Sequence, residues 1–252
     1  MSLLLSPVVV TPLLKVPLLL SNAVCTYHGM KPPTPIAQPK ERARFSKGDV
    51  LGQLWTPNVM VKLAFILRTT ICGVAAAEAA ALLAEHFPSA VSDRLLAFLF
   101  PSTSARPTSL YTSPLFIVAS ALATTGGLIR IACHRALGRF FSWQMSVQDG
   151  HKLITTGPYS IVRHPSYSGW LLLVAGNTLA LLGPGSYIAT SGLLDSRAGK
   201  VGAGAVVGYL AFVTYVLCSR IPKEDEVLSK EFGEEWQAWS KTTPYRLIPY
   251  VY

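Results

Sequence analysis

The stretch GPYSIVRHPSYSGWLLLVAGNTLALL, residues 157–182, joins two kinds of sequence that require different surroundings. Its first part carries Arg163 and His164 among aromatic rings, prolines and glycines. Its second part has no charged residue from Gly169 onward and opens an apolar run of about the length, roughly 20 residues, that crosses a bilayer core. The stretch therefore predicts a polar loop that ends at a membrane-spanning helix.

The composition of the whole chain supports a membrane protein. Half of the residues are hydrophobic, only 14% are charged, and the mean hydropathy is +0.39. An all-α integral membrane protein with about five transmembrane helices is expected. A signal peptide is the alternative for the first span, which Lys15 and three prolines interrupt, but no basic region precedes it and residues 23–25 fit a cleavage site poorly. The expected spans lie near 3–24, 59–84, 110–133, 168–190 and 201–219.

The basic residues are distributed unevenly between the loops. Clusters of Lys and Arg follow the first, third and fifth expected spans, and cytosolic loops collect such residues. With five spans, this pattern places the N-terminus in the lumen and the 134–167 segment and the C-terminal tail in the cytosol. The net charge of +9 is thereby explained by topology, and no nucleic-acid partner is expected because the charges form no single stripe.

The C-terminal tail, residues 218–252, allows two structures around Pro222. If the fifth span continues through it, Arg220 and Glu224 lie four residues apart on one helix face. Alternatively Pro222 begins a new amphipathic helix over 223–239 that lies along the membrane interface, and this interfacial helix is expected. Its acidic residues are expected on the solvated face: Asp225, Glu226, Glu234 and Glu235.

Other polar and small residues have mainly structural interpretations. Glu78 in the second span is expected to face a partner or a polar cavity, and its role is open. Gly204 and Gly208 have the spacing of a close helix contact. No metal is expected, because the four cysteines are scattered and His151 and His164 lack acidic or thiol neighbours.

Four motifs together resemble the isoprenylcysteine carboxyl methyltransferase family over roughly residues 138–250. The resemblance implies two parts: residues 1–137, with N-terminal transmembrane helices and a basic cytosolic loop, and residues 138–252, a methyltransferase core with a cytosolic cofactor loop. It also implies an endoplasmic reticulum enzyme that uses S-adenosyl-L-methionine to methylate the α-carboxylate of a prenylated C-terminal cysteine after CaaX processing. The partners implied are prenylated proteins and membrane lipid. The motifs are HKLITTGPY (151–159), RHPSYSGW (163–170), Arg220 with Glu224, and FGEEW (232–236).

The resemblance also implies roles for particular residues. Arg220 and Glu224 are the expected catalytic residues, and Arg220 is expected to bind the substrate carboxylate. That nucleophile is already ionised, so orientation of the reactants is the main requirement and no strong general base is needed. The expected cofactor contacts are Gln144, His151, Lys152, Leu153, Ile154, Tyr159, His164, Pro165, Ser166, Tyr167 and Glu224.

Two other functions remain open from the sequence. Related membrane methyltransferases act on the amine of phosphatidylethanolamine, and they share an RHP-like loop with a nearby glutamate. The second of these functions is a non-catalytic membrane scaffold or a reductase-like relative without methyl transfer. A nicotinamide-using relative should carry more basic residues in the loop than Lys152 and Arg163, and the chain has no glycine-rich dinucleotide motif.

Overall fold

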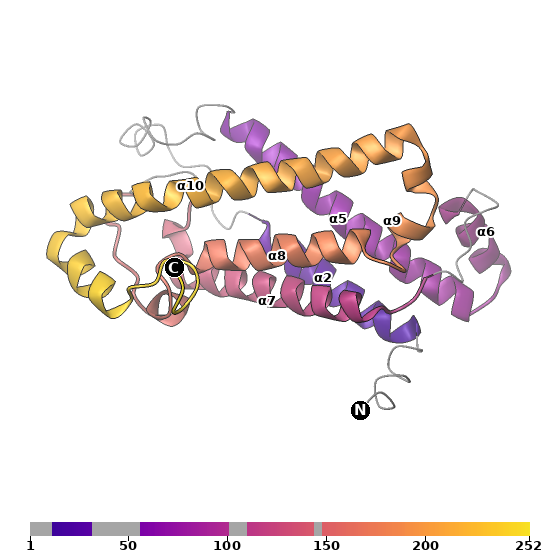
Figure 1. Cartoon of the computed structure of the whole chain (residues 1–252), viewed down its shortest axis with the longest axis horizontal. Helices are drawn as coiled ribbons and strands as arrows, with labels where there is room; N and C mark the ends of the chain where they lie inside the picture. The colour runs from indigo at the N-terminus through magenta and orange to yellow at the C-terminus, as the bar shows by residue number, and fades with distance from the viewer. Residues whose placement is uncertain (1–11, 32–55, 101–109, 144–147) are drawn as a thin grey trace. The chain divides into compact units, whose positions relative to one another are not determined.

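The computed structural model describes residues 12–31, 56–100, 110–143 and 148–252 (Figure 1). Their regular structure is helical throughout, which confirms the all-α prediction for this part of the chain. Short 3-10 turns η1 (Pro12–Leu14), η3 (Gly138–Phe140), η4 (Gly157–Ser160) and η5 (Leu193–Asp195) join the helices. The helices are α2 (Lys15–Gly29), α5 (Pro57–His86), α6 (Ala90–Leu99), α7 (Pro114–Leu137), α8 (Pro165–Leu182), α9 (Tyr187–Thr190) and α10 (Arg197–Thr242).

Four of the described helices, α5, α7, α8 and α10, are long and apolar enough to cross a membrane. The chain is therefore an integral membrane protein. Three of the four begin with a proline, at Pro57, Pro114 and Pro165. Proline suits this position because the first N–H groups of a helix have no partner inside the helix and the ring fixes a helical φ.

The expected first span differs from the helix in that region. Helix α2 has 15 residues and begins at Lys15, whereas a helix needs about 20 residues to cross the hydrocarbon core. The expected range began at residue 3, and residues 1–11 lie outside the described part of the chain.

The expected separate interfacial helix over 223–239 is wrong. Helix α10 continues through Pro222 to Thr242, and its one non-helical residue is Gly233, with φ 50° and ψ −118°. A proline removes one backbone hydrogen bond, which a long helix tolerates, whereas the positive φ at Gly233 is readily adopted only by glycine. The helix direction therefore changes at Gly233, eleven residues after Pro222.

The described helices contribute to two compact units, each built from three separate stretches of chain. The first unit comprises Met1–His28, Leu67–Thr125 and Leu172–Leu210. Its apolar core brings together residues from α2, α5 and α7 with the segments around α6. The largest buried members are Leu19, Leu82, Phe100, Leu110 and Phe116.

A buried ion pair lies inside the first unit. Lys15 Nζ is 2.5 Å from Glu78 Oε1, and both side chains are almost fully buried. Lys15 also donates to the carbonyl oxygens of Tyr111 and Gly185, and Glu78 Oε2 accepts the backbone N–H of Tyr187. The sequence expectation that Glu78 faces a partner is correct, and the partner is the lysine that interrupts the first apolar run.

Helices α7 and α8 approach each other closely in the first unit at Gly176 (Figure 1). A Cβ added at Gly176 would overlap backbone atoms of Ala119 and Ala123. By contrast, nothing lies within 4 Å of a Cβ added at Gly204 or Gly208. The helix contact predicted for the Gly204–Gly208 pair is therefore wrong, and the close contact involves a different glycine.

We expect Gly176→Ala to lower the free energy of unfolding by about 1–3 kcal/mol, because the added methyl group forces two backbones apart. Thermal unfolding of the purified protein in detergent measures the effect. The matched control is Gly204→Ala, whose methyl group enters open space. Equal unfolding temperatures for the two variants would show that the α7–α8 contact is looser than described.

The second unit comprises Gly29–Ile66, Gly126–Leu171 and Ala211–Tyr252. Part of its core packs Cys133 of α7 against Tyr159 and against Trp239 of α10. Trp239 Nε1 also donates to the carbonyl oxygen of Tyr159 at 3.1 Å. The residues after Gly233 therefore hold the loop between α7 and α8 in place.

Candidate functional site

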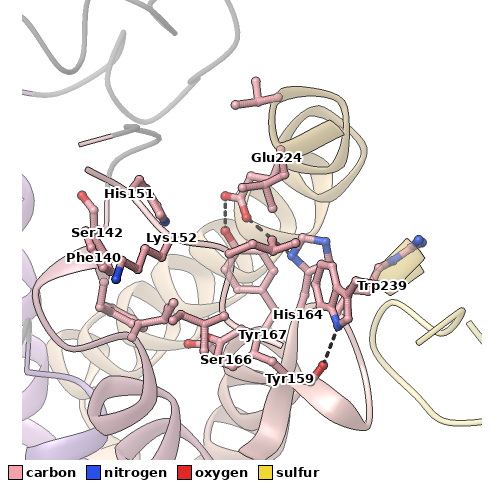
Figure 2. Close-up of a pocket in the computed structure, with 17 residues that line it drawn as sticks. Phe140, Ser142, His151, Lys152, Tyr159, His164, Ser166, Tyr167, Glu224 and Trp239 are labelled. Carbon is pink, nitrogen blue, oxygen red and sulfur yellow. Dashed lines mark hydrogen bonds and ion pairs between the residues drawn. The ribbon is translucent and has the colours of Figure 1, made fainter. Parts of the chain in front are cut away.

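A pocket of about 170 Å³ lies in the second unit (Figure 2). Its walls come from the end of α7 and the following residues, the loop before α8, the first turn of α8, and α10. Polar and apolar residues both line it: Leu137, Phe140, Phe141, Ser142, His151, Lys152, Leu153, Ile154, Tyr159, Arg163, His164, Ser166, Tyr167, Glu224, Val227, Leu228 and Trp239.

The GPY segment fixes one wall of the pocket. Gly157 has φ +63°, a conformation that side chains with a Cβ rarely adopt, and the 3-10 turn η4 follows immediately. This turn directs Tyr159 into the core, where its side chain is buried. Burial, reinforced by the neighbouring Cys133, raises the pKa of Tyr159 well above its usual value, so Tyr159 is a neutral hydroxyl at physiological pH.

Glu224 is the centre of the polar part of the pocket. The Tyr167 hydroxyl donates to Glu224 Oε1 at 2.5 Å, and His164 Nδ1 lies 3.5 Å from Glu224 Oε2. Figure 2 shows both residues pointing toward the carboxylate from below. Pro165 begins α8, and the His164 carbonyl accepts the N–H of Tyr167, so the RHP sequence ends the loop and starts the helix at the residues that meet Glu224.

Arg220 and Glu224 form the predicted pair on α10. Arg220 Nη2 is 3.5 Å from Glu224 Oε1, and the Arg220 side chain is only 3% exposed. Arg220 Nη1 also donates to the carbonyl oxygen of Trp143 at 2.9 Å. Arg220 itself is not among the pocket-lining residues. It contacts the pocket-lining Glu224 and partly neutralises the charge of that carboxylate.

His164 lies between two carboxylates. Its Nδ1 faces Glu224 at 3.5 Å, and its Nε2 lies 3.0 Å from Asp225 Oδ1. Burial alone lowers the pKa of His164, but the hydrogen bonds to Asp225 and Glu224 outweigh burial and raise that pKa above its ordinary value. The imidazole is therefore stabilised as the cation.

The prediction that Asp225 lies on the solvated face is wrong. Asp225 is 5% exposed and contacts three cationic side chains, those of His164, Arg163 and Arg246. The sequence around Asp225, KEDE, is typical of a solvated helix face, and it does not distinguish the buried acid from the exposed one. Glu226 is half exposed and paired with Lys223 and Lys230.

The remaining predicted cofactor contacts are placed as follows. His151 stacks on the Phe140 ring with centroids 4.7 Å apart, and its burial lowers its pKa, which favours the neutral ring. Lys152, Leu153, Ile154 and Ser166 line the pocket, whereas Pro165 does not. Gln144 lies outside the described residues.

The sequence interpretation missed Arg130 as a site residue. Arg130 is buried in α7, and its Nη1 donates to the hydroxyl and the carbonyl oxygen of Ser166 at 3.0 and 3.1 Å. Its Nε donates to the carbonyl oxygen of Gly29 at 2.6 Å. Arg130 therefore holds the first turn of α8, a role that only a contact with a distant segment reveals.

The part of the chain that the structure describes contains no group of three or more His, Cys, Asp or Glu residues arranged to hold a metal ion.

Comparisons with known proteins agree with the motifs. Residues 118–195 match the model of the isoprenylcysteine carboxyl methyltransferase (ICMT) family. Protein-S-isoprenylcysteine O-methyltransferase B of Arabidopsis thaliana is 31% identical over 128 residues, which cover 50% of this chain and 55% of that protein. A probable protein-S-isoprenylcysteine O-methyltransferase of Oryza sativa subsp. indica is 30% identical over 118 residues, covering 46% and 52%.

A second group of relatives has a different name. A Delta(14)-sterol reductase of Mus musculus is 29% identical over 103 residues, which cover 41% of this chain and 20% of the reductase. This chain thus spans about half the length of the two methyltransferases above and a fifth of the reductase. The family match includes the loop from His151 to Tyr167 but ends before Arg220. The resemblance of this chain to the isoprenylcysteine carboxyl methyltransferase family, predicted from its motifs, is confirmed.

Proposed function

We propose that the protein transfers a methyl group from S-adenosyl-L-methionine to the α-carboxylate of a prenylated C-terminal cysteine. The proposal is carried by one observation: Glu224, which contacts Arg220, Tyr167 and His164, lines a pocket that combines polar residues with an apolar wall. The family resemblance and the names of the two plant relatives support the same chemistry.

The residues of the pocket suit S-adenosylmethionine. Bound there, this cofactor supplies a methyl group on a positively charged sulfur and also carries an amine and an adenine ring. Glu224 offers a fixed negative charge to the cationic groups, and the Tyr167 hydroxyl orients that carboxylate. An adenine ring suits the apolar and aromatic wall, which includes Phe140, Val227 and Leu228.

Arg220 suits the second reactant, a carboxylate. Its guanidinium is planar and permanently charged, so it can bind both oxygens of a carboxylate. The substrate carboxylate is ionised at physiological pH and needs no base to remove a proton, so orientation of the reactants is the main requirement. We propose that Glu224 positions the cationic cofactor and that Arg220 positions the anionic substrate. In the free protein the two side chains pair with each other.

We also propose that this pocket faces the cytosol in the endoplasmic reticulum membrane. The support is the cluster of basic residues on the segment that carries the pocket, among them Arg135, Arg139 and Lys152. Prenylated proteins approach from that side, and the surrounding lipid would take up the prenyl chain.

The experiment is transfer of labelled methyl from S-adenosylmethionine to N-acetyl-S-farnesylcysteine by membranes that contain the chain, with phosphatidylethanolamine assayed in parallel. Base-labile label on the farnesylcysteine is expected. The Arg220→Ala variant should lose this transfer while retaining most of its S-adenosylmethionine binding, because Arg220 is assigned to the carboxylate.

Label in the lipid alone would replace the proposal with an amine methyltransferase. The match to a sterol reductase favours one further candidate, a reductase, for which a nicotinamide cofactor would be the reductant. Of the cations that line the pocket, Arg163 and His164 are already paired with Asp225, which leaves Lys152 as the remaining cation there for a phosphate. NADPH-dependent reduction of a sterol, with no methyl transfer, would establish that candidate instead.

A further inference from the structure

We propose that Asp225 is a positioning residue for this pocket, which acts by fixing the imidazolium of His164 and by fastening the C-terminal segment 243–252 to the loop before α8. The inference rests on the proposed function only in treating His164 and Glu224 as part of the cofactor site. Neither the motifs nor the comparisons assign Asp225 a role.

Asp225 divides its two oxygens between different parts of the chain. Oδ1 lies 3.0 Å from His164 Nε2, whereas Oδ2 accepts from Arg246 Nε at 3.0 Å and lies 3.2 Å from Arg163 Nη2. One carboxylate on α10 therefore contacts the loop, the residue that precedes α8, and the C-terminal segment. The side chain is nearly buried, so these contacts are poorly screened by water.

The C-terminal segment meets the same loop through its backbone. The N–H of Arg163 donates to the carbonyl oxygen of Tyr245 at 2.9 Å, and the N–H of His164 donates to that of Arg246 at 2.8 Å. The Ser168 hydroxyl donates to the carbonyl oxygen of Leu247 at 2.5 Å. Arg246 Nη1 in turn donates to the Tyr252 hydroxyl at 2.9 Å. This bond links the two ends of the short stretch from Arg246 to Tyr252.

These contacts decide which atom of His164 meets Glu224. With Nε2 held by Asp225 and the backbone N–H held by Arg246, Nδ1 is left to face Glu224. The charged and titratable groups around the ring are Glu224 and Asp225 from α10, Arg163 from the loop, Arg246 from the C-terminal segment and Tyr167 from α8. Without Asp225, His164 would have Glu224 as its remaining carboxylate partner, and Glu224 would be less available to a cationic ligand.

The pH dependence follows from the raised pKa of His164. The contribution of the imidazolium to stability is fully present below pH 6.5, the ordinary histidine pKa, and is lost as the pH rises through the higher pKa of the folded protein. In an Asp225→Asn variant the pKa of His164 falls, because one of the two carboxylates that stabilise the cation becomes neutral. The stabilising contribution of the imidazolium is therefore smaller in this variant, and its loss is complete at a lower pH than in the wild-type protein.

The test compares the unchanged chain with Asp225→Asn, Asp225→Glu and the control Glu226→Gln, which removes an exposed carboxylate next to Asp225. Three readouts are used: the titration of His164 by NMR of histidine-labelled protein, the rate at which carboxypeptidase removes the C-terminal segment, and the affinity for S-adenosylmethionine. Asp225→Asn should lower the pKa of His164, speed digestion and weaken binding about tenfold. Asp225→Glu should recover part of each effect, and Glu226→Gln should match the wild type.

An unchanged titration of His164 in Asp225→Asn would overturn the inference, even if the variant unfolds at a lower temperature, because a structural role alone would cause that. If the wild-type protein neither binds S-adenosylmethionine nor transfers methyl groups, yet the titration shifts in Asp225→Asn, then the proposed function fails and the positioning role of Asp225 stands.

Discussion

A Glu224→Gln variant is expected to bind S-adenosylmethionine about 30-fold more weakly, or worse, and to lose methyl transfer accordingly. The amide keeps the size of the side chain but removes the negative charge that faces Arg220 and His164. Both cations would then repel a cationic ligand instead of being neutralised. Isothermal titration of the purified protein with S-adenosylmethionine measures the effect.

The same variant should distinguish S-adenosylmethionine from the product of methyl transfer. S-adenosylhomocysteine has the same shape as S-adenosylmethionine except for the transferred methyl group, and its sulfur is neutral. Glu224→Gln should therefore weaken the binding of S-adenosylmethionine more than that of S-adenosylhomocysteine. Equal losses for both ligands would mean that Glu224 only shapes the pocket. Glu226→Gln is the matched control, because Glu226 lies half exposed on the same helix and pairs with the surface lysines Lys223 and Lys230.

The second large effect is expected far along the chain from the pocket, at Glu78. Glu78→Gln should lower the free energy of unfolding by about 3–5 kcal/mol, because it leaves Lys15 as a buried charge without a counter-ion. The amide can still accept the N–H of Tyr187, so the loss reports the ion pair rather than the backbone contact. Thermal or denaturant unfolding in detergent micelles measures it.

Replacing both partners separates charge from packing. In a Lys15→Met, Glu78→Gln double variant neither member of the pair carries a charge, and part of the lost stability should return although the carbonyl oxygens of Tyr111 and Gly185 lose their donor. Glu85→Gln, about two helix turns further along α5 and partly exposed, should change stability by less than about 0.5 kcal/mol. A Glu78→Gln protein as stable as Glu85→Gln would show that the pair contributes little.

The sequence determined the features that depend on neighbouring residues. Long apolar runs predict helices whatever packs around them, so the all-α membrane architecture and the approximate positions of α5, α7, α8 and α10 were predictable. A spacing of four residues on a helix puts Arg220 beside Glu224. Pro165 likewise separates the loop from α8, because it restricts the residue before it and suits the first turn of a helix.

Only the tertiary structure decided which polar residues are buried and with whom. Asp225 and Glu226 are adjacent acids on one helix, yet Asp225 meets Arg246 and the loop while Glu226 faces exposed lysines. Lys15 interrupts an apolar run in the sequence, and in the structure it pairs with the buried Glu78. Gly176 and Gly204 differ only in the backbones that approach them. In each case the environment of a residue is set by a segment distant in sequence, and the free energy of a buried charge or a close backbone contact depends on that segment rather than on local sequence.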